Sequence, residues 1–310
     1  LAETHRHTVM AGRTLTQQAL PITFGLKCAG WLVAVHEATD RLAELRRTRL
    51  AVQFGGAAGT LAALGDAGTG IAGRLAEELD LAEPALPWHT NRTRVAELAG
   101  ALGTTAGVLG KLALDVLLLA QTEVAEVAEA TGGGSSAMPH KQNPVRAVLV
   151  TAATRRVPGL VATLLAGMAQ EHERAAGAWH AEWPTLTDLL HLVGGAAAHG
   201  RDLLAGLRVD AARMRHNLDA TAGLPLAEHV AARLAPALGR TAAQDLVARA
   251  CRDAVAAGRP LRDALLADPV VRDQLGPADI DAALDPAGYL GSAQAFVDRA
   301  LALHRKAARP

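Results

Sequence analysis

Aromatic residues are scarce in this chain of 310 residues, where Phe, Trp and Tyr together make up only 3%. Sheets draw on aromatic and β-branched side chains, so this scarcity disfavours a fold built on sheets. Alanine, leucine and arginine are abundant instead, and all three favour helices. No alternating run of apolar and polar residues is long enough to indicate a strand. The composition therefore predicts an all-α protein.

Cysteine is also scarce, since the chain has only Cys28 and Cys251, which lie far apart in helix-like contexts. This excludes a disulfide framework and favours two buried free thiols over a catalytic one. His5 and His7 have no acidic or cysteine partners at the spacing of a zinc site. We predict neither a metal nor a cofactor.

Net charge and long apolar runs are lacking as well. Lys and Arg together number 31, as do Asp and Glu, so the formal net charge is zero. The sequence has no basic arm of the kind that binds nucleic acid, so we expect no nucleic-acid partner. No stretch comes near the roughly 20 apolar residues of a membrane span, because Lys111 and Asp115 interrupt the longest candidate. Residues 1–7 are polar and unlike a signal peptide, so we expect a cytoplasmic protein with no membrane partner.

The clearest pattern that is present is an apolar repeat between Asn91 and Ala128, which advances in alternating steps of three and four residues. It includes Val95, Leu98, Leu102, Thr105, Leu109, Leu112, Val116 and Leu119. Steps of this kind predict a helix on the order of 50 Å long with one apolar seam. Similar spacing at 26–47, 157–168 and 186–203 indicates more long helices and hence a bundle.

Glycine and proline breaks become more frequent after residue 208, which predicts shorter helices there. We therefore predict two domains. Residues 1–208 would form a central long-helix bundle that carries a loop at 132–143. Residues 209–310 would form a small helical C-terminal domain.

The segment from Ser135 to Pro144 combines residues that could make a serine act as a base. A serine ionises only when fixed positive charge and oriented donors stabilise its alkoxide. Lys141 supplies charge, and we expect Asn143 to cap a helix whose first residue is Pro144. Free N–H groups at the start of that helix would face the loop. The glycines at 132–134 would let the loop close over a ligand and reopen.

Residues 134–143 resemble the signature Gly-Ser-Ser-x-Met-Pro-x-Lys-x-Asn of the fumarase/aspartase superfamily at every fixed position. The resemblance implies a long-helix bundle followed by a small helical domain. It also implies a homotetramer whose active sites are built from several subunits. Superfamily members also carry a first active-site block ahead of the Gly-Arg-Thr block, and the given sequence does not include it. If the protein begins at Leu1, we expect weak or no turnover.

A second block, Gly12 to Pro21, resembles the superfamily's Gly-Arg-Thr-His block, except that Leu15 stands in place of the histidine. In fumarase-like members that histidine works with a glutamate, whose position corresponds to Val148. The resemblance implies that this pair manages a proton of the attacking or leaving group. Its replacement by two aliphatic residues predicts a reaction without such a proton.

The segment from Gln170 to Trp183 resembles the 3-carboxy-cis,cis-muconate cycloisomerase family, as do the strings at 53–61 and 87–90. Adenylosuccinate lyases carry an arginine suited to a nucleotide phosphate where this chain has Trp183. The resemblance implies an isomerase of protocatechuate breakdown, in the β-ketoadipate pathway, that closes a lactone. A substrate carboxylate adds to its own alkene, and this nucleophile is already ionised, in agreement with Leu15 and Val148.

The chemistry then assigns roles. Ser135 would transfer a proton to or from carbon, and Lys141 would stabilise its alkoxide and the substrate carboxylates. A small polycarboxylate needs cationic or hydrogen-bonding neighbours. The candidates for substrate binding are Arg13, Thr14, Gln17, Ser136, Met138, His140, Asn143, His172 and His180.

Other interpretations stay open. Arg13 could form only an ion pair, His172 and His180 could be structural, and Glu182 could hold an arginine in place. The protein could be a superfamily lyase that eliminates from an adenylosuccinate- or fumarate-type substrate, although Leu15 disfavours this. It could also be an inactive fragment or a structural relative without activity.

Overall fold

The structure, a computed structural model, describes residues 1–130, 133–134 and 137–307. It falls into two compact units, each assembled from segments that lie far apart in the sequence. The first unit comprises residues 1–33, 121–127 and the chain from residue 209 onward. The second comprises residues 34–120 and 128–208.

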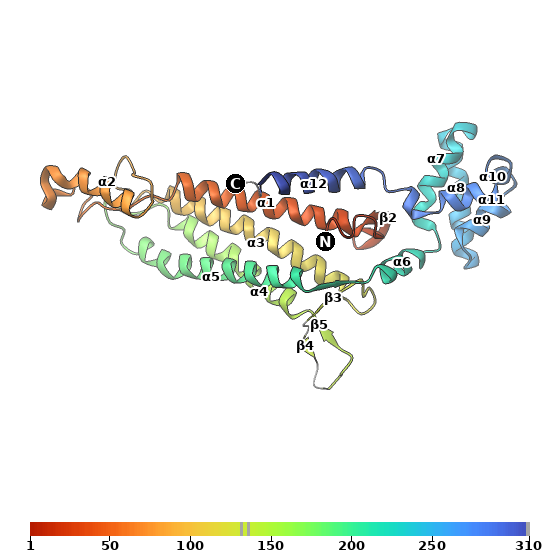
Figure 1. The fold of residues 1–310 in the computed structure, drawn as a ribbon, viewed down its shortest axis with the longest axis horizontal. Coiled ribbons are helices and arrows are strands. Elements are labelled where there is room, and N and C mark those ends of the chain that lie inside the picture. The colour runs from red at the N-terminus through yellow and green to blue at the C-terminus, as the bar shows by residue number, and fades with distance from the viewer. Residues whose placement is uncertain (131–132, 135–136, 308–310) are drawn as a thin grey trace. The chain divides into compact units, whose positions relative to one another are not determined.

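Long helices build the second unit (Figure 1). They are the later part of α1 (Phe24–Thr48), α3 (Thr93–Leu119), α4 (Val145–Ala166) and α5 (Ala178–Ala205). The helix predicted from the apolar repeat is confirmed by α3. Its buried seam contains Val95, Leu102, Leu109, Leu112, Val116 and Leu119. The other two members of the repeat, Leu98 and Thr105, are half-buried.

The core of this unit lies between α3, α4 and α5. Its buried residues are Val95, Ala99, Leu102, Ala106, Val157, Leu164, Leu189 and Val193. Glycines let α3 and α4 approach closely, because a Cβ atom on Gly103 would lie 3.2 Å from Val161 Cγ2. Helix α4 continues through Pro158, and α5 through Pro184. Buried apolar surface, at roughly 25 cal/mol per Å², is thus what holds these helices together.

By length and composition alone, α3 and α4 are apolar enough to cross a membrane. The expectation that no stretch comes near a membrane span is wrong by that criterion, since alanine, leucine and valine outweigh the few charges. Of the apolar window in α3, 44% is buried inside the chain, against 17% in α4. A bundle's core helix passes the same test, so these two helices are weak support for a membrane span.

A hairpin opens the first unit. Strand β1 (Val9–Thr14) pairs antiparallel with β2 (Gln17–Thr23). Two further strand pairs are short: β3 (Val127–Glu129) with β6 (Leu207–Val209), and β4 (Gly133–Gly134) with β5 (Gln142–Asn143). The predominantly helical class is confirmed, but these strands were missed. Their alternation is too short and too mixed to detect.

Short helices form the C-terminal part of the first unit. They are α6 (Ala211–Asp219), α7 (Ala227–Leu238), α8 (Arg240–Ala257), α9 (Leu261–Ala267), α10 (Pro269–Gln274), α11 (Pro277–Ala283) and α12 (Ala293–Ala307). Side chains cap several of them, since Asp210 accepts from Arg213 N and Asp268 from Val270 N and Val271 N. Each such cap contributes about 1 kcal/mol. Helix α12 is tied to the N-terminal residues, where Arg6 Nε donates to Gln294 Oε1.

Two more elements of the second unit lie between α1 and α3 in the sequence. They are the 3-10 helix at Ala62–Ala67 and α2 (Gly68–Glu78). In the first unit, 3-10 turns at Leu224–Leu226 and Pro286–Gly288 join the short helices.

Candidate active site

The described residues of the signature segment lie directly before α4. Strands β4 and β5 pair Gly133 with Asn143 and Gly134 with Gln142. Beyond them, Lys141 N donates to Met138 O at 2.9 Å, and the side chains of Met138, His140 and Lys141 are exposed. Ser135 and Ser136 lie outside the described residues, so their predicted roles stay predictions.

The start of α4 differs from the prediction. The helix begins at Val145, Pro144 occupies the cap position, and Asn143 belongs to β5. The Asn143 side chain donates to Gly133 O at 3.0 Å and caps no helix. Asn143 as a helix cap and Pro144 as the first helical residue were therefore wrong, because the amide group joins the two sides of the loop.

The first N–H groups of α4 do not all face the loop. The buried carboxylate of Glu129 accepts from Arg146 N at 3.1 Å and from Ala147 N at 2.9 Å. The prediction that free helix N–H groups stabilise the serine alkoxide is thus wrong for these two donors. Sequence reasoning missed Glu129, since it stands 17 residues before Arg146.

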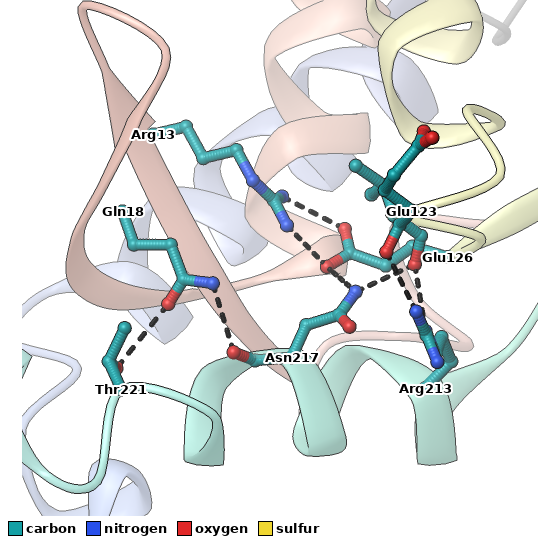
Figure 2. A network of polar contacts seen from close by, with 8 residues as sticks. Arg13, Gln18, Glu123, Glu126, Arg213, Asn217 and Thr221 are labelled. Carbon is teal, nitrogen blue, oxygen red and sulfur yellow. Dashed lines mark hydrogen bonds and ion pairs between the residues drawn. The ribbon is translucent and has the colours of Figure 1, made fainter. Parts of the chain in front are cut away.

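Arg13 faces a carboxylate of its own chain. Its two terminal nitrogens donate to Glu126 Oε2 at 2.9 Å and Oε1 at 2.6 Å, and the Glu126 side chain is wholly buried (Figure 2). Asn217 Nδ2 donates to Glu126 Oε1 at 2.9 Å. A buried carboxylate must be paired to remain charged, so Arg13 has a structural task. Of the alternatives for Arg13, the ion pair is observed.

Thr14 and Gln17 face each other at the end of the β1–β2 hairpin and are exposed. The turn between them consists of Leu15 and Thr16, whose φ angles are 49° and 65°. Left-handed angles at both turn residues match the right-handed twist of hairpin strands, although glycine or asparagine usually supplies them. Leu15, the residue in place of the family's histidine, is 95% exposed.

His172 and His180 lie in the second unit. His172 is exposed, in the connection between α4 and α5, and has a left-handed φ of 47°. His180 is exposed on the first turn of α5, and its ring lies 4.8 Å from that of Trp183 and 5.6 Å from that of Trp179. Both histidines are therefore accessible to a ligand.

His89 is a residue that sequence analysis did not single out. It is buried against Trp179, with ring centroids 4.5 Å apart, and its Nε2 has no hydrogen-bond partner among the described residues. Burial lowers the pKa of His89, and the charges of Arg174 and Arg92 lower it further. Beside it, Glu182 pairs with Arg92, which confirms the view that Glu182 holds an arginine in place.

The candidate residues thus fall into two groups. Arg13, Thr14 and Gln17 belong to the first compact unit, whereas the loop at 132–143, His172 and His180 belong to the second. Among the described residues, no cluster of three His, Cys, Asp or Glu side chains could hold a metal ion. A surface cavity of about 550 Å³ lies in the C-terminal helices, and none of the candidate residues lines it.

Comparisons with known proteins bear on both parts of the chain. A family described as lyase matches residues 1–159, and a family described as adenylosuccinate lyase C-terminus matches residues 223–300. The chain is 54% identical to a 3-carboxy-cis,cis-muconate cycloisomerase from Pseudomonas aeruginosa, over 98% of this chain and 67% of the relative. It is also 49% identical to a nitrosuccinate lyase from Streptomyces davaonensis, over 97% of this chain and 66% of the relative.

Solved structures agree with this similarity. The 3-carboxy-cis,cis-muconate lactonizing enzyme from Pseudomonas putida superposes with a TM-score of 0.93 at 49% identity. The match covers 98% of this chain and 68% of that one. The chain therefore spans about two thirds of the length of the proteins that it matches.

Proposed function

The chain belongs to the fumarase/aspartase lyase superfamily, and from that premise we propose that it acts on 3-carboxy-cis,cis-muconate as a cycloisomerase. The observation that carries the proposal is the similarity over nearly the whole chain to cycloisomerases, at 54% and 51% identity in two species. The loss of the polar pair at Leu15 and Val148 supports it, because lactone closure needs no base to activate an ionised carboxylate.

The proposed step is an internal addition. A carboxylate oxygen of the substrate forms a bond to a carbon of its own conjugated alkene. The π electrons move to the carbon next to another carboxylate, which becomes enediolate-like, and that carbon then takes a proton. Because both reacting groups belong to one molecule, proximity supplies much of the rate. The protein has to stabilise the new charge and supply the proton.

Ser135 is the proposed proton donor, and the base in the reverse direction. Lys141 is exposed, and its backbone N–H donates to Met138 O. Its ammonium group is the proposed partner of a substrate carboxylate. His140, Met138 and Ser136 would line the same loop. The binding of substrate carboxylates by Thr14, Gln17, His172 and His180 belongs to this proposal.

Arg13 has a narrower part in it. Two of its five donors are held by Glu126, so a substrate could receive only the remaining ones. We propose that the groups of the two compact units come together in a homotetramer in which subunits share each site. Each unit carries part of the candidate set, which is why the proposal includes an assembly.

A second candidate is a superfamily lyase that acts on another dicarboxylate. The 49% identity to a nitrosuccinate lyase favours it, since this is close to the values for the cycloisomerases. Such a reaction eliminates a group and leaves a new alkene, whereas lactone closure removes one alkene. The direction of the absorbance change with each substrate therefore separates the two candidates.

The test is to add 3-carboxy-cis,cis-muconate to the purified protein and follow the loss of its ultraviolet absorbance. Wild type and Ser135→Ala are run side by side, both as this chain and extended to the relatives' length. We expect a loss of absorbance that disappears in Ser135→Ala. Nitrosuccinate is the parallel substrate, and turnover of it alone would replace the cycloisomerase proposal by the lyase.

A further inference from the structure

The carboxylate of Glu129 joins the two ends of the signature loop. Glu129 ends β3 on one side, and Arg146 and Ala147 begin α4 on the other. Oε2 accepts from Arg146 N at 3.1 Å and Oε1 from Ala147 N at 2.9 Å. With 4% exposure, this side chain is shielded from water. Hydrogen bonds to a carboxylate are charge-assisted and stronger than those between neutral groups.

Three other contacts tighten the same place. Asn143 Nδ2 donates to Gly133 O at 3.0 Å, and the backbones of Gly133 and Asn143 pair as β4 and β5. A Cβ atom on Gly133 would lie 2.5 Å from Val145 Cγ2, so a larger residue there would force the Val145 side chain to move. We call Glu129, Gly133, Asn143, Arg146 and Ala147 the neck of the loop.

The backbone of Glu129 is itself held in place. Ala130 N donates to Gly206 O at 2.8 Å, and an Arg208 terminal nitrogen donates to Glu129 O at 3.2 Å. These bonds come from the residues that follow α5, Gly206 and Arg208 of β6, so the backbone that carries the carboxylate is supported from outside the loop. Glu129 is therefore fixed both at its backbone and at its carboxylate, and it links the end of β3 to the start of α4.

We propose that Glu129 is a positioning residue, which fixes the neck and thereby holds Lys141 at its working place. It touches no substrate and acts through α4. The inference rests on the proposed function for its effect on turnover, but the geometry of the neck can be tested without any substrate. The N–H groups of Arg146 and Ala147 at the start of α4 therefore bind a carboxylate of the chain itself rather than an anionic ligand.

The substrate-free test is limited trypsin digestion of the folded protein, with cleavage after Lys141 followed by mass spectrometry. In Glu129→Ala we expect this bond to be cut about five to ten times faster, the ratio that follows from loss of a typical cap. Glu129→Gln keeps one acceptor oxygen for two N–H groups, so its rate should lie between those of wild type and Glu129→Ala. Glu129→Gln also serves if the alanine variant does not fold.

Asp268 supplies a matched control, because its carboxylate caps α10 by accepting from Val270 N at 2.8 Å and Val271 N at 3.3 Å. Asp268→Ala removes the same type of bond at a helix far along the chain from the signature loop. We expect it to lower the melting temperature by a few degrees, as Glu129→Ala does, and to leave cleavage after Lys141 unchanged.

Turnover gives the second readout. Glu129→Ala should lower kcat on the order of 10- to 100-fold with a smaller change in KM, because misplaced catalytic groups affect the transition state most. Asp268→Ala should leave kcat at the wild-type value. If the protein extended to the relatives' length does not turn over the substrate, the proposed function fails, while the digestion still decides the role of the neck. Cleavage after Lys141 at the wild-type rate in Glu129→Ala would overturn the inference.

Discussion

Each compact unit of this protein contains a buried arginine–carboxylate pair, and the two pairs are built differently. In the first unit, Glu126 is wholly buried and receives Arg13 together with Asn217. In the second, Arg92 donates to Glu182 through Nε at 3.0 Å and through a terminal nitrogen, among aromatic rings. Arg92 also lies over Trp88, at 5.2 Å from the ring centroid.

The difference lies in what satisfies the remaining groups. Glu126 gains a neutral donor, Asn217, whose Nδ2 also donates to Val124 O at 2.7 Å. Arg92 instead donates to a backbone carbonyl, that of His89, at 2.9 Å, and meets the π face of a tryptophan. A buried pair is stable only when its spare donors and acceptors are occupied. An amide group can therefore do this for the anion, and an aromatic ring for the cation.

Removing the cation of the first pair should have the largest effect. Arg13→Ala leaves Glu126 charged and buried without its main partner, and we expect the free energy of unfolding in urea to fall by about 3–5 kcal/mol. Adding Glu126→Gln in the same chain should recover part of the loss. Arg215→Ala, which breaks an exposed pair with Asp219, is the control and should change little. A small effect of Arg13→Ala would mean that the pair is dispensable and Arg13 free for substrate.

The same change in the second pair should be somewhat weaker. Arg92→Ala leaves Glu182, whose side chain keeps 11% exposure and so some access to water. We expect a loss of about 3 kcal/mol, which includes the contact with Trp88. Arg92→Lys keeps the charge but loses the two-pronged geometry, and should fall between. A larger loss than in Arg13→Ala would reverse the comparison.

Asn217 tests the neutral partner. Asn217→Ala removes the donor to the charged Glu126 and should cost about 2 kcal/mol, again measured in urea. Asn217→Asp has the same shape but places a second carboxylate beside the first. It should destabilise more than alanine does, and equal losses would show that charge plays no part at this position.

The smallest effect concerns pH and the second pair. The pKa of His89 is lowered in the folded chain, first by burial and then by Arg174 and Arg92. The unfolded chain therefore binds more protons, and the free energy of unfolding should fall as the pH drops below about 6.5. His89→Gln should reduce this slope by a fraction of a kcal/mol over one pH unit. The pKa of His5 is also lowered in the folded chain, so part of the slope should remain in the His89→Gln variant.

Features that depend on a repeat within one helix could be predicted from the sequence. The seam of α3 was found because burial of one helix face imposes a spacing of three and four residues. The partner of Arg13 could not be found, since Glu126 stands 113 residues away and no local pattern joins them. Sequence alone could not tell an arginine that binds a substrate from one that neutralises a buried carboxylate.

The start of α4 shows a second limit. Asn143 followed by Pro144 is a typical helix start, and the expected cap was reasonable by propensity. Glu129, which is distant in the sequence, accepts hydrogen bonds from the start of α4 instead, because its carboxylate is buried there. The Asn143 side chain donates to Gly133 O. Local preference of about 1 kcal/mol yields to such a tertiary contact. His89 was missed because the burial of a single side chain produces no repeating pattern in the sequence.

The exposed hairpin turn has a consequence for how this chain could change over generations. Leu15 projects from the turn and Val148 is 50% exposed on α4, so neither is required by the packing of the chain. Exposed substitutions usually alter folding stability by less than about 0.5 kcal/mol. A lineage could therefore exchange both residues for a histidine and a glutamate without passing through a misfolded intermediate. Selection on catalysis, rather than on folding, would then decide whether Leu15 and Val148 are kept or are replaced by histidine and glutamate.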